Sequence, residues 1–173
     1  LDWLEEFHLD GLRLDDVHAI IDDGAVHLLE ALARRVRETV GRERAVHLVL
    51  ENEENQAARL ARTENRQPAT YTAQWNDDVH HALHVAATGE DAGYYADYAG
   101  DPEKLACALA QGFAFQGQVM ACRGEARGEP SAHLPPMAFV SFIQNHDQVG
   151  NRAFGDRIDA SAPPEAIEAL AAV

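Results

Sequence analysis

The sequence is poor in cysteine, in positive charge and in long apolar runs, and each shortage excludes a class of protein. Its two cysteines, Cys107 and Cys122, are too few for a disulfide framework and lack the spacing of a metal site. We therefore expect reduced thiols, as in a cytoplasmic protein. No apolar run approaches the ~18 residues of a membrane-spanning helix. No basic segment followed by an apolar core marks a signal peptide.

The charge balance also restricts the possible partners. The chain has 14 Lys and Arg residues against 29 Asp and Glu residues, a formal net charge of −15. Nucleic acids and anionic membranes are bound through clusters of Lys and Arg, so we predict neither kind of partner. A neutral ligand rich in hydroxyl groups is compatible with such a surface. The chain begins at Leu1 within an amphipathic segment, and we expect it to be part of a longer protein.

Apolar patterns predict alternating strands and helices. Short apolar runs indicate strands around Leu12 and Leu14 and at 45–51, 70–76 and 137–144, the last being the most apolar. Helical spacing indicates helices over 26–40, with Gly41 as C-cap, and over 79–87. A third helix is expected to begin at Asp101 and to bury Leu105, Leu109 and Phe113, and a fourth to follow Ser161. Residues 117–136 are expected to be irregular. This alternation predicts a parallel α/β sheet. Because a (β/α)8 barrel needs ~250 residues, 1–173 reads as the central part of such a TIM barrel.

Acidic residues follow the predicted strands. Asp15, Glu51 and Asp147 each stand at or just beyond a strand, and Asp77 and Asp78 follow another. Ligands bind parallel α/β folds at the carboxyl ends of the strands. Arg13 precedes Asp15 by two positions, so both side chains share one face of the strand, and a guanidinium there favours an ionised carboxylate. Glycoside hydrolysis requires this kind of set, an ionised nucleophile and a protonated acid.

Three other interpretations remain open at this stage. Arg13 and Asp15 can form a plain structural ion pair, and an acid at a strand's end can cap the following helix. A metal site is the third interpretation, because His80 and His84 lie one helical turn apart. Residue 81 is His rather than Glu, so the HExxH pattern of zinc proteases fails. We therefore expect a hydrogen-bonded or solvated histidine face, and no metal or other cofactor.

Three segments, GLRLDDVH (11–18), LVLENEEN (48–55) and FIQNHDQVGNR (142–152), resemble signature regions of the α-amylase superfamily of glycoside hydrolases, in the same order. They are most similar to its malto-oligosyltrehalose trehalohydrolase members. The segment QWNDDVHHALHVAATGEDAGYYADY (74–98) and the Gln-Val-Gly-Asn-Arg sequence after Asp147 resemble that subfamily in particular. The resemblance covers essentially the whole chain and implies strands four to seven of the catalytic barrel.

The resemblance also implies roles for individual residues. Asp15 matches the nucleophile. Glu51 matches the general acid/base, and Glu53 is the alternative for that role. Asp147 matches the third acid, which stabilises the transition state. Arg13 matches the arginine that orients the nucleophile, and His146 the histidine that grips the sugar. Further substrate contacts are expected from the following residues: His18, Asn55, Trp75, Asp77, Asp78, Gln148, Asn151 and Arg152. For His18 an ordinary helix-start position, and for Trp75 a core position, remain the alternatives.

The activity implied is cleavage, with retention, of the α-1,4 bond beside the terminal trehalose unit of maltooligosyltrehalose. A branching enzyme, an amylase or a non-catalytic glucan-binding relative are the alternatives, with a metal-dependent hydrolase as a further one. The family's third-strand aspartate and histidine lie outside these 173 residues, as do barrel strands one to three and eight and the C-terminal β domain. We therefore expect the isolated segment to be inactive.

Overall fold

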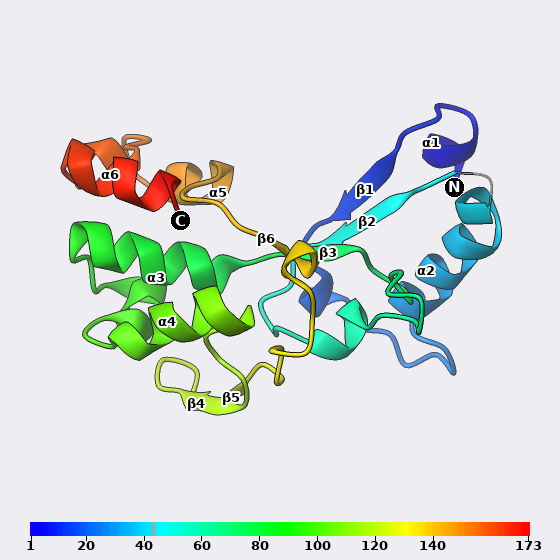
Figure 1. Ribbon diagram of the computed structural model, residues 1–173, viewed down its shortest axis with the longest axis horizontal. Helices are drawn as coiled ribbons and strands as arrows, with labels where there is room; N and C mark the ends of the chain where they lie inside the picture. The colour runs from blue at the N-terminus through cyan, green and yellow to red at the C-terminus, as the bar shows by residue number, and fades with distance from the viewer. Residues whose placement is uncertain (43) are drawn as a thin grey trace. The chain divides into compact units, whose positions relative to one another are not determined.

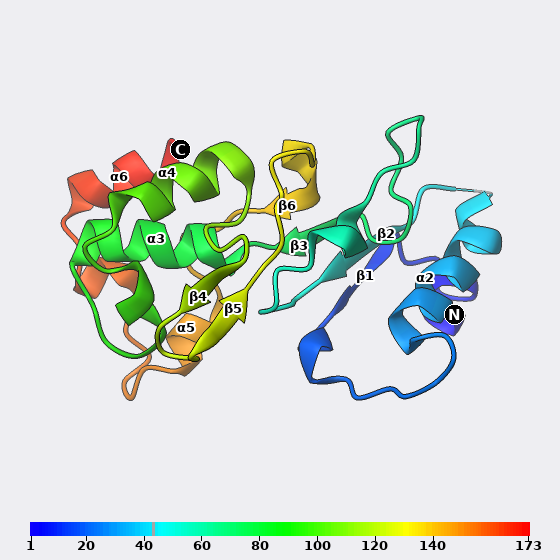
Figure 2. The same ribbon diagram turned by 90° about the horizontal axis from the view of Figure 1, so that it is seen from below.

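The computed structural model describes residues 1–42 and 44–173 and divides them into two compact units (Figures 1 and 2). The first unit combines Leu1–Trp75 with Leu134–Val140, and the second combines Asn76–His133 with Ser141–Val173. The predicted α/β fold with a parallel sheet is confirmed. In the described part of the chain, no helix combines the length and apolarity needed to cross a membrane.

The first unit contains the parallel sheet. Its strands are β1 (Gly11–Leu14), β2 (His47–Leu50), β3 (Ala73–Trp75) and β6 (Phe139–Val140), paired in that order. The register places Leu14 opposite Leu50 and Leu50 opposite Gln74. The carboxyl ends of the first two strands are therefore level, and the residues that follow them meet at one edge. A Cβ at Gly11 would stand 2.3 Å from the carbonyl oxygen of His47, so this close approach of β1 to β2 requires glycine.

Helix α2 (Leu28–Glu38) buries Leu29, Ala33 and Val36, while α1 (Asp2–Glu5) lies near the N-terminus. His27 caps α2 by accepting a hydrogen bond from the Leu29 amide. At its other end Arg37 donates to the carbonyl oxygens of Val46 and Thr70, which ties the helix to the starts of β2 and β3. The fully buried residues of this unit include Leu4, Leu29, Ala33, Val36, Leu48, Leu50, Leu60 and Tyr71.

The second unit is a helical assembly with a small hairpin. Its elements are α3 (Asp77–Thr88), α4 (Pro102–Gln111), β4 (Gln118–Met120), β5 (Glu125–Arg127), α5 (His146–Gly150) and α6 (Pro164–Ala171). Helices α3 and α4 run side by side, and α6 packs against α3 (Figure 1). The core between them contains Val79, Ala82, Leu83, Tyr98, Ala108, Ala114, Phe115 and Met120. Among the described residues, 3-10 turns are formed by Val17–Ala19, Val40–Arg42, Ala57–Leu60, Gly93–Tyr98, Pro136–Ala138 and Ile158–Ala160.

Several local predictions about helices need correction. Helix α2 ends with Thr39 as its C-cap, so Gly41 is not the cap but lies in a 3-10 turn. Val26 precedes that helix and is exposed. In α4 the predicted Asp101 cap is confirmed, since its carboxylate accepts from the Glu103 amide. Leu109, however, is 48% exposed, and Ala108 is the buried residue of that helix.

The strands also differ from their predicted extent. The most apolar predicted strand, 137–144, is reduced to the two residues of β6, because the chain leaves the sheet after Val140. Residues 117–136, expected to be irregular, contain the antiparallel pair β4–β5. Leu12 and Leu14 predict a buried strand, yet β1 is only partly buried along its length.

Candidate active site

Arg13 and Asp15 lie together at the end of β1, as their spacing predicts. The Nη1 atom of Arg13 donates to Oδ1 of Asp15 across 2.7 Å. The side chain of Asp15 is 74% exposed, whereas that of Arg13 is 25% exposed. The pair thus presents an oriented carboxylate to solvent from a partly buried cation. This is the arrangement that a carboxylate nucleophile requires.

The ring of Trp75 also contacts the Arg13 guanidinium. The ring of Trp75, at the end of β3, lies 3.9 Å from the Cζ atom of Arg13. Stacking of this kind on a guanidinium is a cation–π contact. Trp75 is half-buried, so it is not the core tryptophan of the alternative interpretation. Its demonstrated contact is with Arg13, and its contact with sugar stays a prediction.

Glu51 follows β2 directly and is tied to the turn after Asp15. The Asp16 amide donates to Oε2 of Glu51 at 2.5 Å, and the Val17 amide donates to the carbonyl oxygen of Glu51 at 3.1 Å. Burial raises the pKa of the Glu51 carboxyl, against the lowering effects of the Asp16 amide, His18 and Arg13. A carboxyl with a raised pKa stays protonated more readily near neutral pH and can act as a general acid.

His18 lies between the loop that follows β1 and the loop that follows β2. Its Nδ1 accepts from the Glu53 amide at 3.3 Å, and its Nε2 lies 3.0 Å from Oδ1 of Asp16. The residue belongs to the 3-10 turn Val17–Ala19 and has a clear set of partners, which favours a defined role over an unremarkable start of a helix. Both ring nitrogens face protein groups, so the predicted sugar contact of His18 is not supported by this geometry.

Asn55 lies inside the first unit. It is 1% exposed and its Oδ1 accepts from Nε2 of Gln74 at 3.1 Å. Gln74 is fully buried on β3 and also donates to the carbonyl oxygen of Asn52. The expected substrate contact of Asn55 is therefore wrong for this structure, because a buried amide cannot meet a sugar. Its contribution is to hold the loop after β2.

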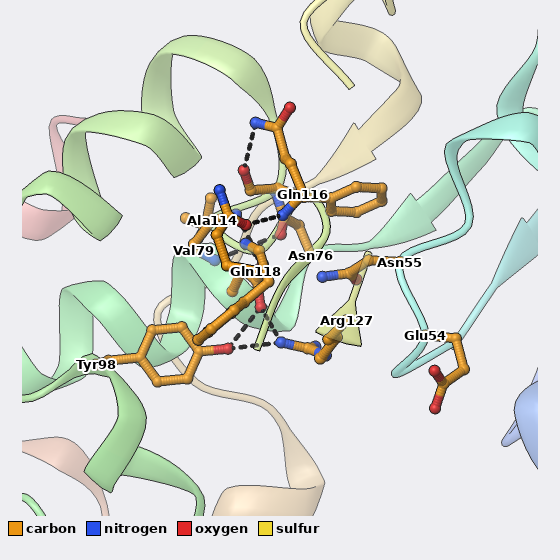
Figure 3. A network of polar contacts seen from close by, with 12 residues as sticks. Glu54, Asn55, Asn76, Val79, Tyr98, Ala114, Gln116, Gln118 and Arg127 are labelled. Carbon is orange, nitrogen blue, oxygen red and sulfur yellow. Dashed lines mark hydrogen bonds and ion pairs between the residues drawn. The ribbon is translucent and has the colours of Figure 1, made fainter. Parts of the chain in front are cut away.

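Asp78 is also a structural residue rather than a sugar contact. Its side chain is fully buried, and its carboxylate accepts from Arg127 at 2.6 Å, from Tyr98 and from the amides of Ala114 and Phe115. Figure 3 shows the Tyr98 hydroxyl beside the Arg127 guanidinium, a contact of 2.9 Å. The prediction of a sugar contact at Asp78 is wrong, because every direction around the carboxylate is occupied. Asp77, one residue earlier, is only half-buried, and its role stays a prediction.

The predicted third acid lies in the second unit, on α5. Asp147 is exposed and belongs to the first turn of this helix, seven positions after the end of β6 rather than directly at the strand. His146 is exposed beside it, with Nε2 3.4 Å from Oδ1 of Asp147. Gln148 is 5% exposed and accepts from the Asn145 amide in a capping box. Gln148 thus positions the turn that presents Asp147, and its contact with sugar stays a prediction.

Arg152 and Asn151 line a pocket in the second unit. The guanidinium of Arg152 donates to both carboxylate oxygens of Glu90, at 2.7 and 2.5 Å. These bonds lower the pKa of Glu90 to about 2. With Tyr94 and Asn151, both residues line a pocket of about 550 Å³. Arg152 therefore has a structural partner that sequence reasoning missed, while its position and that of Asn151 remain compatible with substrate binding.

The histidines of α3 form a buried aromatic cluster. Nδ1 of His80 donates to the carbonyl oxygen of Ile143 at 2.6 Å, and Nε2 of His84 contacts the carboxylate of Glu90 at 2.6 Å. Burial lowers the pKa of His80 to about 4 and that of His81 well below its usual value. The rings stack with Tyr94, Tyr95 and Phe142. The hydrogen-bonded alternative to a zinc site at His80 and His84 is therefore the one that fits.

One group of residues in the described part of the chain could hold a metal ion, Asp16, His18 and Glu51. Their ligand atoms lie within 4.8 Å of one another. The Nε2 of His18 and Oδ1 of Asp16 already meet each other, and Oε2 of Glu51 already accepts the Asp16 amide. Hydrogen bonds within the protein thus account for this cluster.

Sequence reasoning missed Arg127 and Glu90. Each is the charged partner of a residue expected to touch sugar, Asp78 and Arg152 respectively. Arg127 lies 49 positions from Asp78, and Glu90 lies 62 positions from Arg152. No local spacing links such distant positions, so no signal in a single sequence could have found them.

Comparisons with known proteins find relatives over nearly the whole chain. No family model matches the chain. A protein from Arthrobacter ramosus named malto-oligosyltrehalose trehalohydrolase is 43% identical over 173 residues, covering 99% of this chain and 30% of its own length. A protein of the same name from Mycobacterium tuberculosis is 42% identical, and the match covers 91% of this chain and 27% of that protein. Another from Saccharolobus solfataricus is 36% identical, and the match covers 99% of this chain and 29% of that protein. A crystal structure from Salmonella typhimurium, described as a candidate alpha amylase, is 49% identical, with a TM-score of 0.94 over 97% of this chain and 29% of that one.

The fold of this chain is similar to that of the Salmonella protein described as a candidate alpha amylase. The chain is more narrowly related, over nearly its whole length, to a segment of the malto-oligosyltrehalose trehalohydrolases, and the predicted resemblance is confirmed. It spans about 30% of the length of these curated relatives.

Proposed function

We propose that the protein to which this chain belongs is a retaining glycoside hydrolase acting on maltooligosyltrehalose. It cleaves the α-1,4 bond beside the terminal trehalose unit and releases trehalose. The observation that carries the proposal is the pairing of two different carboxyl groups at the ends of neighbouring strands. Asp15 stands exposed beside the Arg13 cation, and Glu51 has a raised pKa through burial. Two carboxyl groups in opposite protonation states are what a retaining mechanism needs.

In the proposed reaction Glu51 protonates the oxygen of the leaving group and Asp15 attacks the anomeric carbon. A covalent glycosyl–Asp15 intermediate forms as the bond to the leaving group breaks. Glu51, now ionised, takes a proton from water, and the resulting hydroxide equivalent displaces Asp15 with a second inversion. Arg13 holds the nucleophile in place. The reaction requires no metal or other cofactor.

Asp147 and His146 are proposed to act on the sugar at the cleavage point. Both side chains are exposed on the first turn of α5, which leaves them accessible to a ligand. Asp147 would accept hydrogen bonds from sugar hydroxyls and stabilise the oxocarbenium-like transition state. Trp75, Asp77, Asn151 and Arg152 are the remaining proposed contacts. A reducing, cytoplasmic location is compatible with the free thiols of Cys107 and Cys122.

We further propose that residues 1–173 form the central part of a (β/α)8 barrel, with β1, β2, β3 and β6 as its fourth to seventh strands. Four parallel strands that pair in the order of the sequence support this proposal. The remaining strands and a C-terminal β domain would come from the rest of the protein. Since catalytic residues come from the ends of several barrel strands, the isolated segment should be inactive.

Product analysis of the whole protein tests the proposal. The protein is incubated with maltooligosyltrehalose and, separately, with maltooligosaccharide of the same length, and the products are separated by chromatography. Free trehalose from the first substrate, with little action on the second, is the expected outcome. Maltose or branched glucan as the product would leave the roles proposed for the three acids unchanged but would show that the protein has a different substrate specificity.

A second candidate is an amylase-type or branching activity on α-glucan. The Salmonella structure, described as a candidate alpha amylase and 49% identical, favours it. Hydrolysis of plain maltooligosaccharide, or transfer products from it, would identify this activity. A non-catalytic glucan-binding relative would show binding without products, and a metal-dependent hydrolase would lose activity with a chelator.

A further inference from the structure

The turn after β1 brings a main-chain donor to the acid/base. Asp16 adopts a left-handed conformation, with φ 48° and ψ 42°, which is unfavourable for a residue with a Cβ. This conformation turns two consecutive amides toward the chain that follows β2. One meets the side chain of Glu51 and the next meets its carbonyl oxygen. The residue after the nucleophile thus fixes the orientation of the acid/base.

The ring of His18 connects this turn to the chain that follows β2. Its Nδ1 accepts the Glu53 amide proton, so that nitrogen carries a lone pair. In a neutral ring the proton must then be on Nε2, which faces Oδ1 of Asp16 at 3.0 Å. The Nε2–H group therefore donates to the Asp16 carboxylate. One imidazole ring bridges the loop after β1 and the loop after β2.

We propose that His18 is a positioning residue: by holding Asp16 in its left-handed turn, it keeps the Asp16 amide on Oε2 of Glu51 and leaves the acid proton on Oε1. The inference rests on the proposed function of Asp15 and Glu51. It differs from the expected role of His18, which is a contact with substrate. The energy of the strained turn is offset by the Asp16–His18 hydrogen bond, so the turn depends on the ring.

The direction of the effect on pH dependence follows from the same contacts. The Asp16 amide bond lowers the pKa of Glu51, and the titratable or charged groups facing this carboxyl are His18, Arg13 and Asp15; Asp16 and Glu53 face His18 itself. Loss of the amide bond raises the pKa of Glu51. A general acid works below its pKa, so the descending alkaline limb of kcat/KM moves to higher pH.

The test uses the whole protein with maltooligosyltrehalose and the variant His18→Ala. We expect kcat to fall between about ten- and about a hundredfold through lost orientation, with KM changed less than about twofold and the alkaline limb shifted upward. His133→Ala, at an exposed histidine, is the matched control. A rise in KM with an unmoved alkaline limb would show that His18 is a sugar contact and would overturn the proposal. An unchanged kcat would overturn it as well.

Two further variants test the two hydrogen bonds of the His18 ring separately, and they keep the proposal testable if His18→Ala does not fold. His18→Gln retains a donor near the position of Nε2, whereas His18→Asn retains an acceptor near that of Nδ1. If the bond to Asp16 holds the turn, Gln retains more of the wild-type kcat than Asn does. The reverse order would overturn the proposal. If the wild-type protein itself releases no trehalose, the proposed function fails instead, and the two failures are thereby distinct.

Discussion

Asp78 and Arg127 form a fully buried ion pair, with Nη1 of Arg127 donating to Oδ1 of Asp78 across 2.6 Å. Their side chains are 0% and 4% exposed. The pair joins the first turn of α3 to β5, and the other carboxylate oxygen accepts the amides of Ala114 and Phe115. Tyr98 donates to the same carboxylate. A single side chain at the start of one helix therefore organises three segments of the second unit.

We predict that removing one partner destabilises the second unit strongly. Arg127→Met leaves the Asp78 carboxylate buried without its cation, and the free energy of unfolding should fall by about 3–5 kcal/mol. Chemical denaturation of the protein, followed by circular dichroism, measures the change. Arg66→Met, at an exposed arginine, is the control. A loss below about 1 kcal/mol would contradict the structural role assigned to the pair.

Asp15→Asn should abolish turnover by the whole protein and leave the fold intact. The amide has nearly the same shape as the carboxylate but cannot form the covalent intermediate. The side chain is 74% exposed, so we expect the unfolding midpoint to change little. Trehalose release and thermal melting are measured together. Activity retained above a few per cent in the variant would reject Asp15 as the nucleophile.

Glu51→Gln tests the acid/base through the choice of leaving group. With maltooligosyltrehalose the variant should lose most of its activity, because the leaving alkoxide is no longer protonated. With an α-glycosyl fluoride, whose leaving group needs no proton, the glycosylation step should persist. Rapid-quench measurement of the fluoride released in the first turnover checks this. Glu53→Gln is made in parallel, and a larger loss there than at Glu51 would transfer the acid/base role to the fallback residue.

Glu90 should make the second unit sensitive to acid. Hydrogen bonds from Arg152 lower its pKa from 4.5 to about 2. A folded-state pKa below the unfolded value means that the stabilisation is present above pH ~4.5 and is lost as the pH falls through about 2. Melting temperatures between pH 2 and 7 should therefore decline less in Glu90→Gln than in the wild type. Glu64→Gln, at an exposed glutamate, should follow the wild-type curve; equal curves for all three proteins would refute the assignment.

The sequence alone determined those features that depend on near neighbours along the chain. The i, i+2 spacing of a strand places Arg13 and Asp15 on one face, and the ion pair follows. Asp101 before Pro102 is a local capping signal, and α4 begins there. The parallel sheet also followed from the alternation of apolar runs, because crossover connections lead to parallel strands.

Only the tertiary structure decided which polar residues are accessible. Asp77 and Asp78 are neighbours of the same charge, yet one is half-buried and the other is enclosed by groups from distant segments. Asn55 likewise became an internal hydrogen-bond partner of Gln74, which lies 19 positions away. The extent of β6 was decided in the same way, since a strand ends where its neighbour ends and not where apolar residues run out. These outcomes depend on contacts between residues far apart in the chain, and such contacts leave no pattern in a single sequence.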